Sequence, residues 1–179
     1  MNSEIYFITG NKNKFREASY LIPQLKQLDI DLPEIQDINP RTIIESKIEE
    51  AKKHSIGKIV CEDISLHIDA LNGFPGPLIK WYLKSLGNIG IYENLCSSNK
   101  KAKTVATVAY FDGNKTHFFE GMVEGEIVIP SGEGFGFDPI FKPKGHKKTY
   151  SQMSLEEKNI ISHRSIAFRK LQKYLMSEN

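Results

Sequence analysis

The sequence predicts an α/β fold in which helices pack on a mixed β-sheet that is parallel in part. Two observations lead to this prediction. Apolar runs of strand length alternate with helical patterns over residues 5–61, which is typical of parallel strands. A long apolar run then precedes the hairpin signal Asp112-Gly113-Asn114. Because the chain has 179 residues and no internal repeat or long linker, we expect residues 1–179 to form a single domain.

The first part of the chain is expected to contain three strands and two helices. Ile5–Thr9 is apolar almost throughout, as in a strand buried on both faces. Asn11 or Asn13 can cap the helix that follows, and Pro23 stops that helix after about Leu21. The next elements are a strand, a helix with an apolar face and a short third strand, which cover Leu25–Ile30, Thr42–His54 and Ile59–Cys61.

The second part is expected to begin with a loop rich in glycine and proline. The elements after it are a helix closed by a glycine, the two strands of a hairpin and a glycine-rich loop, which cover Leu78–Gly87, Lys103–Phe111, His117–Ile129 and Pro130–Phe141. A capping box at Ser154–Glu157 starts a short helix. Ser162 can cap the last helix, in which Phe168, Leu171 and Leu175 recur at helical spacing.

Composition narrows the class of protein. The 24 basic and 22 acidic residues give a net charge of +2, which argues against nucleic acid or a membrane as a partner. Cys61 and Cys96 form no C-x-x-C pair, so reduced thiols are expected rather than a zinc site or disulfides. No stretch reaches the roughly 18 apolar residues of a membrane span, and the N-terminus lacks a signal-peptide pattern. We therefore expect a soluble, cytoplasmic protein.

The segment Thr9–Lys14 carries small residues, amides and lysines where a buried strand turns into a helix. Backbone N–H groups at a helix start bind phosphate well, and Lys14 adds a positive charge. The segment lacks the G-x-x-x-x-G-K-[ST] pattern of a Walker P-loop. A phosphate site and an ordinary solvated turn both remain open on this pattern alone.

Three acidic residues are candidates for a metal site. Glu62 and Asp63 directly follow a predicted buried strand, where ligands of parallel sheets commonly bind. Glu34 lies in a loop after another predicted strand. Mg²⁺ prefers one or two carboxylates together with substrate phosphates, so a magnesium site is possible here. The alternative is that Asp63 caps a turn and Glu34 is simply exposed.

Two further clusters could contact a base. The stretch GFGFDPIF places Phe135 and Phe137 in a glycine-rich loop, where a ring can lie flat on a base or fill the core. Lys158, His163 and Arg164 bring cationic groups to the start of the last helix, although cations there oppose the helix dipole. That conflict favours a functional role, and an ordinary helix end is the alternative.

Taken in order, these motifs resemble the inosine triphosphate pyrophosphatase family. The matching segments are TGNKNK at 9–14, ED at 62–63, DALNGFPGP at 69–77, IKW at 79–81, GFGFDPIF at 134–141 and EKNIISHR at 157–164. The resemblance extends from Ile5 to about Leu175. It implies a long central mixed sheet with a substrate cleft between two lobes, and a homodimer. It also implies Mg²⁺-dependent hydrolysis of ITP, dITP and XTP to the monophosphate and pyrophosphate.

The resemblance assigns roles to matching positions. Asp63 would be the general base, and Glu34 and Asp63 would hold Mg²⁺. Ile64 stands where the family often has Ser or Thr, so a contact there would come from the backbone. The remaining substrate-binding residues would be the triphosphate cradle Thr9, Gly10, Asn11, Lys12, Asn13 and Lys14, the phosphate-binding Lys47 and Lys80, the purine-contacting segment Phe135, Gly136, Phe137 and Asp138, and Lys158, His163 and Arg164 near the nucleotide.

Three other functions remain open. A nucleotide-binding regulator would use the same loop and lysines without turnover, although the carboxylates argue against it. A nucleic-acid-binding protein is disfavoured by the near-neutral charge. A phosphatase that removes only the terminal phosphate would differ in its product, because it releases orthophosphate rather than pyrophosphate.

Overall fold

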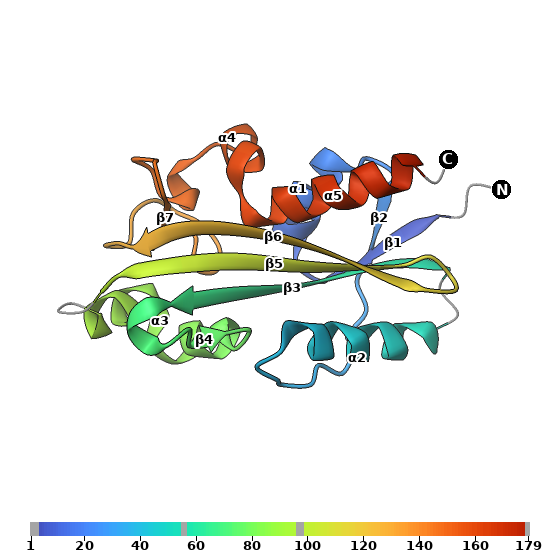
Figure 1. Ribbon diagram of the computed structural model, residues 1–179, viewed down its shortest axis with the longest axis horizontal. Coiled ribbons are helices and arrows are strands. Elements are labelled where there is room, and N and C mark those ends of the chain that lie inside the picture. Colours follow the sequence, from blue (N-terminus) through green and yellow to red (C-terminus); the bar gives the residue numbers. More distant parts are fainter. Residues whose placement is uncertain (1–3, 55–56, 96–98, 178–179) are drawn as a thin grey trace.

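The computed structural model describes residues 4–54, 57–95 and 99–177. A seven-stranded mixed sheet runs the length of the molecule (Figure 1), in the order β2-β1-β3-β5-β6-β7, and β4 pairs with β3. The strands are β1 Ile5–Ile8, β2 Leu25–Leu28, β3 Lys58–Ile68, β4 Pro75–Gly76, β5 Lys101–Phe111, β6 Thr116–Ile127 and β7 Phe141–Pro143. β1 is parallel to β2 and β3, and the other pairs are antiparallel. The predicted mixed, partly parallel sheet is therefore confirmed.

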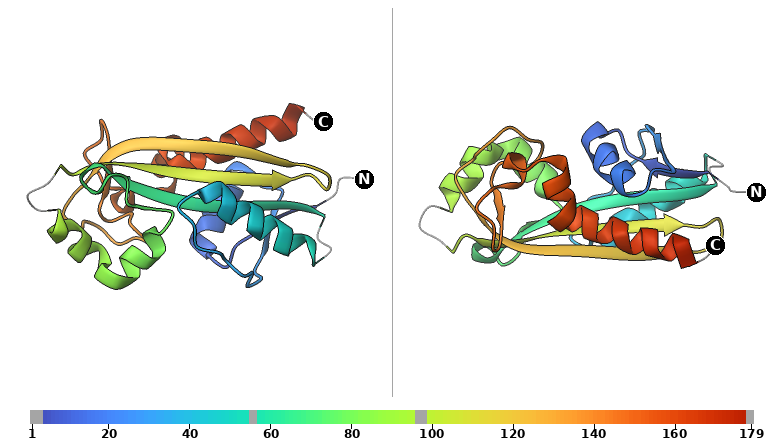
Figure 2. Two further views of the ribbon diagram at one scale, coloured as in Figure 1. Left: turned by 60° about the horizontal axis from the view of Figure 1, so that its bottom comes forward. Right: turned by 90° about the horizontal axis from the view of Figure 1, so that it is seen from above.

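Helices cover both faces of this sheet (Figures 1 and 2). On one face, α5 packs on β5 and β6, and α1 packs beside α5. On the other face, α2 packs on β3 and β5, and α3 lies against β3 and β4. The helices are α1 Lys12–Leu21, α2 Pro40–Lys52, α3 Ile79–Asn94, α4 Leu155–Ile161 and α5 His163–Ser177, with short 3-10 turns at Asp69–Leu71 and Tyr150–Gln152.

β3 is much longer than expected. We predicted that the third strand ends at Cys61, and this is wrong because β3 continues to Ile68 in an unbroken ladder with β5. Glu62 and Asp63 consequently lie within the strand rather than after it. β1 pairs with β3 only as far as Val60, and β4 begins to pair only at Leu66. Between these two points one edge of β3 has no strand partner among the described residues, and this gap in the sheet positions the site.

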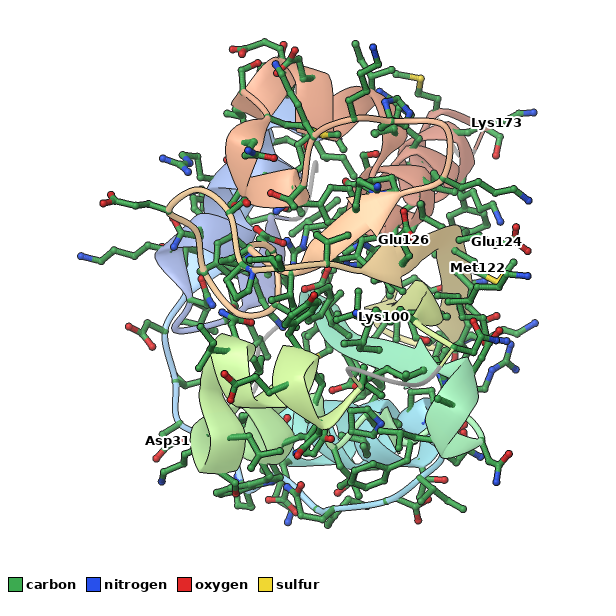
Figure 3. The ribbon with its side chains drawn as sticks, turned by 90° about the vertical axis from the view of Figure 1, so that its left-hand side faces the viewer. Asp31, Lys100, Met122, Glu124, Glu126 and Lys173 are labelled. Atoms are coloured by element: carbon green, nitrogen blue, oxygen red, sulfur yellow. The ribbon has the colours of Figure 1, made fainter. Side chains whose placement is uncertain are left out.

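Close backbone contact fixes α5 on the sheet. A Cβ atom built at Gly121 of β6 would lie 2.0 Å from the carbonyl oxygen of His163, so only glycine fits there. Phe168 and Leu171 of α5 are fully buried against the strands, and Phe168 meets Phe7 of β1 edge to face. On the opposite face, the second half of β6 is open to solvent, because Met122, Glu124 and Glu126 are exposed and point outward in Figure 3.

Several boundaries differ from the expectations. The third helix does not close at Gly87, which instead forms a kink (φ 65°, ψ 175°) before helical residues resume up to Asn94. β4 lies within the expected loop rich in glycine and proline, and β7 begins at Phe141, the last residue of the expected loop at 130–141. Each strand is only two or three residues long, which is too short to give a strand pattern in the sequence. The expected caps are present at Asn11, Ser154 and Ser162. Cys61 is a free, buried thiol, and Cys96 lies outside the described residues.

No helix in residues 4–54, 57–95 and 99–177 combines the length and apolarity needed to cross a membrane.

Candidate active site

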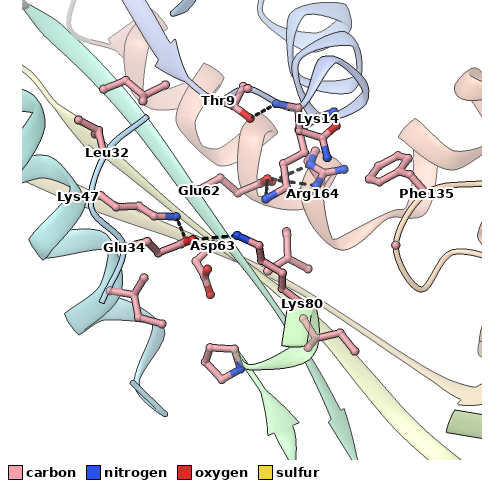
Figure 4. Close-up of a pocket in the computed structure, with 18 of the residues that line it drawn as sticks. Thr9, Lys14, Leu32, Glu34, Lys47, Glu62, Asp63, Lys80, Phe135 and Arg164 are labelled. Atoms are coloured by element: carbon pink, nitrogen blue, oxygen red, sulfur yellow. Dashed lines mark hydrogen bonds and ion pairs between the residues drawn. The ribbon is translucent and has the colours of Figure 1, made fainter. Parts of the chain in front are cut away.

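A cavity of about 540 Å³ opens at the gap in the sheet beside β3. Its walls come from elements far apart in sequence, and Figure 4 shows their side chains converging on β3. The end of β1 and the start of α1 form one side, and the 30–36 segment, α2 and α3 form another. The loop at 135–138 and the start of α5 close the cavity at its third side. The candidate residues on these walls are Thr9, Gly10, Asn11, Lys14, Glu34, Lys47, Asp63, Ile64, Lys80, Phe135, Gly136, Phe137, Asp138, His163 and Arg164.

The turn between β1 and α1 is locally well ordered by its own polar groups. Asn11 caps α1, since its side-chain oxygen accepts hydrogen bonds from the backbone N–H groups of Asn13 (3.0 Å) and Lys14 (3.1 Å). Thr9 Oγ1 accepts from the N–H of Asn11 at 3.1 Å. The cap therefore already occupies two of the N–H groups that we expected to face a phosphate. Lys12 and Asn13 do not belong to the cavity wall, whereas the Lys14 side chain does.

At the α2 end of the cavity, Glu34 lies between two lysines. It forms ion pairs with Lys47 of α2 and with Lys80 of α3, the latter at 3.6 Å (Figure 4). Burial opposes ionisation of Glu34, but the two lysines outweigh it and hold its pKa below the usual range. The 34–36 segment is also tied to α3, because the indole N–H of Trp81 donates to the Gln36 side chain at 2.5 Å.

Asp63 lies beside Glu34 and differs from it in electrostatics. Burial raises the pKa of the Asp63 carboxyl group to about 6, although Lys47 and Lys14 act in the opposite direction. Its Oδ2 atom is buried without a hydrogen-bond partner among the described residues. A carboxyl group on the cavity wall with a pKa near neutrality fits a proton acceptor or a metal ligand.

On the other face of β3, Glu62 belongs to a buried ion network. Arg164 donates to both Glu62 carboxylate oxygens, at 2.7 and 3.1 Å, and also pairs with Glu17 of α1. Lys158 bridges Glu17 at 2.7 Å and Asp138 at 2.5 Å. Lys14 reaches Glu62 at 3.3 Å. The network ties α1, β3, α4, α5 and the 135–138 loop together around one end of the cavity.

This network explains why cations stand near the start of α5 despite the helix dipole. Arg164 is neutralised by Glu17 and Glu62, and Lys158 is buried behind the wall rather than on it. Burial, with the nearby cations, lowers the pKa of His163 well below its usual range, so its imidazole is neutral. Glu17, which completes the network, was not among the sequence-predicted site residues. Its only signal was its position on α1, one turn after Lys14.

The two phenylalanines of the glycine-rich loop have different environments. Phe137 is buried and packs edge to face on Phe141, so this ring fills the core as one of our two alternatives proposed. Phe135 is only partly buried and stands at the cavity wall (Figure 4). Lys158 and Arg164 lie over its ring, at 4.7 and 5.7 Å from the centroid. Phe135 therefore brings a partly exposed aromatic ring to the end of the cavity beside Arg164.

The comparisons with known proteins agree with this arrangement. The model of the Ham1 family matches residues 5–174. The chain belongs to the Ham1 family. An inosine triphosphate pyrophosphatase of Schizosaccharomyces pombe is 40% identical, over 97% of this chain and 96% of that protein. A relative of the same name from Mycosarcoma maydis is 39% identical, over 98% of this chain and 96% of that protein.

Solved Ham1 structures share the fold. A HAM1 protein from Coxiella burnetii superposes with a TM-score of 0.81 at 26% identity, covering 98% of this chain and 99% of that one. A structure described as a nucleoside-triphosphatase or dITP/XTP pyrophosphatase from Mycobacterium abscessus gives a TM-score of 0.71 at 27% identity, covering 93% of this chain and 97% of that one. The expected family and fold are thereby confirmed.

Proposed function

We propose that this protein hydrolyses the non-canonical purine nucleoside triphosphates ITP, dITP and XTP to the monophosphate and pyrophosphate, which removes them before incorporation into DNA or RNA. The observation that carries the proposal is that the two ends of the cavity differ in their chemistry. One end holds two carboxylates and two lysines, and the other holds a partly exposed aromatic ring beside His163 and Arg164. A triphosphate fits the first end and a purine fits the second. The names of the relatives support the same reaction.

The carboxylate end fits a divalent cation. Glu34 and Asp63 lie side by side in Figure 4, and both belong to the cavity wall. No three acidic, histidine or cysteine side chains come together as metal ligands in the described part of the chain. A pair of carboxylates that leaves coordination positions for substrate phosphates suits Mg²⁺, which we propose as the cofactor. Mg²⁺ held by Glu34 and Asp63 would supply neutralisation and polarisation of the phosphates.

Catalysis then requires a proton acceptor and stabilisation of the leaving group. Asp63 accepts a proton from the attacking water, whose oxygen forms a new bond to the α-phosphorus. The bond from the α-phosphorus to the bridging oxygen breaks, and that oxygen leaves with pyrophosphate. Lys14, Lys47 and Lys80 stabilise the negative charge that develops on the leaving group. As the substrate enters, Lys47 and Lys80 break their ion pairs with Glu34 and pair with phosphate oxygens instead.

Base selection follows from the 6-position of the purine. Hypoxanthine and xanthine carry an oxo acceptor there, whereas adenine carries an amino donor. Donors from His163 or Arg164 pair with the oxo group and leave the amino group of adenine unpaired, which disfavours ATP. The remaining N–H groups of Arg164 are available, because its ion pairs use three of the five.

Product analysis with a panel of nucleotides tests this function. Purified protein with Mg²⁺ is given ITP, XTP, GTP and ATP, and the products are separated. We expect IMP and pyrophosphate from ITP, with ATP almost untouched. Orthophosphate as the product would instead support the terminal phosphatase, and equal turnover of ITP and ATP would refute the base-reading role of the α5 residues.

Two properties extend the proposal beyond the reaction. We propose a homodimer, as the family resemblance implies, and a cytoplasmic location, as the free thiol of Cys61 suggests. Light scattering coupled to size exclusion tests the first, because a mass near the 20.4 kDa of one chain would contradict it. Fractionation of the source cells tests the second.

A further inference from the structure

Unsatisfied polar atoms gather beside Asp63 on the face of the sheet that α2 covers. Asp63 and Ser65 are two residues apart in β3, and Thr107 of β5 stands directly opposite Asp63, so all three point to the same face. Ser65 and Thr107 are completely buried. Asp63 Oδ2, Ser65 Oγ and Thr107 Oγ1 each lack a hydrogen-bond partner in the described part of the chain. The catalytic and binding roles of the cavity residues use neither hydroxyl group.

Such atoms are rarely left unpaired in folded proteins, because burying an unsatisfied polar group costs free energy. Side chains directly opposite in an antiparallel pair have Cβ atoms about 4.5–5.5 Å apart, within reach of a single bridging water. Buried waters typically make about three hydrogen bonds to otherwise unpaired groups. One carboxylate oxygen and two hydroxyl groups provide three such partners on one patch of sheet.

We propose that Thr107 and Ser65 are positioning residues for Asp63, and that their hydroxyl groups share one buried water with Asp63 Oδ2. The bridge anchors one oxygen of the carboxylate to β5 and leaves the other oxygen to face the cavity. The carboxylate is then held in one orientation before the substrate arrives, which is the preorganisation that efficient catalysis requires. This inference rests on the proposed function, because it assigns an orientation to the proposed base.

Kinetics of isosteric variants test the bridge. Thr107→Val removes the hydroxyl group and keeps the shape, and Ser65→Ala removes the second hydroxyl group. We expect each to lower kcat for ITP about 10- to 100-fold, the loss typical of a hydrogen bond to a charged group. KM should change by less than about twofold, because neither side chain lies on the cavity wall. Thr107→Ser restores a hydroxyl group and should recover most of kcat.

Thr104 provides a matched control on the same strand. It is also fully buried and carries the same hydroxyl group, but it stands opposite Leu66 and points to the other face of the sheet. Thr104→Val should therefore keep the kcat of the parent protein. The double variant Thr107→Val with Ser65→Ala should lose little more than either single variant, because each change breaks the same bridge.

The outcomes separate this inference from the proposed function. If the parent protein releases pyrophosphate from ITP and the folded Thr107→Val variant keeps its kcat, the inference is overturned while the proposed function stands. If the parent protein releases no pyrophosphate, the proposed function itself fails. If Thr107→Val does not fold, the Ser65→Ala variant provides the test, and a normal kcat in that variant would overturn the proposed water bridge.

A crystal structure provides an independent test of the bridge. It should show a water in contact with all three side chains, and direct hydrogen bonds from both hydroxyl groups to the backbone would contradict the proposal.

Discussion

Asp63 lies within β3 beside Glu34, and burial raises the pKa of its carboxyl group to about 6. A general base contributes about 10²–10⁴-fold to a rate. Asp63→Asn keeps the size of the side chain and removes its basicity, so we expect kcat for ITP to fall by about that factor with an unchanged circular dichroism spectrum. Near-normal turnover in this variant would remove Asp63 from the mechanism.

The raised pKa also means that ionised Asp63 lowers the free energy of unfolding at neutral pH. A carboxyl group whose folded pKa lies above its ordinary 3.8 contributes stability below pH 3.8, and this contribution is lost as pH rises through about 6. At pH 8 and without metal, the free energy of unfolding of the Asp63→Asn variant should therefore exceed that of the parent protein by on the order of 3 kcal/mol. At pH 4 the difference should be small. Urea unfolding with a chelator present measures both, and equal stability at pH 8 would show that the charge is not costly there.

The residues of the site were largely predictable, but their environments were not. The sequence pointed to Asp63 and Glu34 as the acidic centre, yet the charges of Glu62 and Asp63 suggested that the strand had ended. Charged residues are depleted in strands, and they are tolerated here because one edge of β3 has no partner strand between Val60 and Leu66 in the described part of the chain. That gap depends on how β1 and β4 pair, which no local pattern reveals.

Among the secondary-structure elements, the contact between β6 and α5 sets the position of His163 and Arg164, the proposed base-binding residues. Gly121→Ala would place a Cβ atom 2.0 Å from His163 O, so α5 must move away from the sheet. We expect a lower free energy of unfolding and a higher KM for ITP, because His163 and Arg164 move with the helix. Gly57→Ala is the control, since no atom of the described residues lies within 4 Å of a Cβ there. A normal KM in the Gly121→Ala variant would show that substrate binding does not depend on the position of α5.

The ion network around Arg164 joins α1, β3 and α5, and it makes a distinct prediction. Arg164→Ala leaves Glu17 paired with Lys158 alone and Glu62 with Lys14 alone, and removing one partner from a buried ion pair typically costs about 3–5 kcal/mol. Arg41→Ala breaks a half-exposed pair with Glu120 and should cost less than about 1 kcal/mol. Unfolding in urea compares the two variants, and equal losses would contradict the structural role of the network. Where Arg164→Ala remains folded, KM for ITP should rise and the preference for ITP over ATP should narrow.

The helix starts and the hairpin strands β5 and β6 were the predictable elements, because caps, turn signals and apolar runs are local. The capping box at Ser154 and the cap at Asn11 marked helix starts correctly. The buried pairing of Lys158 with Glu17 and Asp138 was not predictable, since these residues are 141 and 20 positions apart in the chain. From the sequence we expected these cations to bind a nucleotide. In the structure, Lys158 and Arg164 form ion pairs that join α1, β3, α4 and α5.

Across the whole molecule, the site exists because one sheet is shared by both halves of the chain. The first half provides Lys14 at the start of α1 and Lys47 within α2. The second half provides Phe135 in a loop and His163 at the start of α5. β3 belongs to both, since it is parallel to β1 and antiparallel to β5. The order of motifs along the sequence indicated this family, and the crossing of the two halves at β3 explains why the motifs meet.

The central claim is that water attacks the α-phosphorus of the substrate. Hydrolysis of ITP in water enriched in ¹⁸O, followed by mass spectrometry of both products, tests it directly. The account predicts that one labelled oxygen appears in IMP and that pyrophosphate stays unlabelled. Label in pyrophosphate would place the attack at the β-phosphorus, and labelled orthophosphate would place it at the γ-phosphorus. Either result would contradict the proposed roles of Asp63 as the base and of the surrounding lysines in stabilising pyrophosphate.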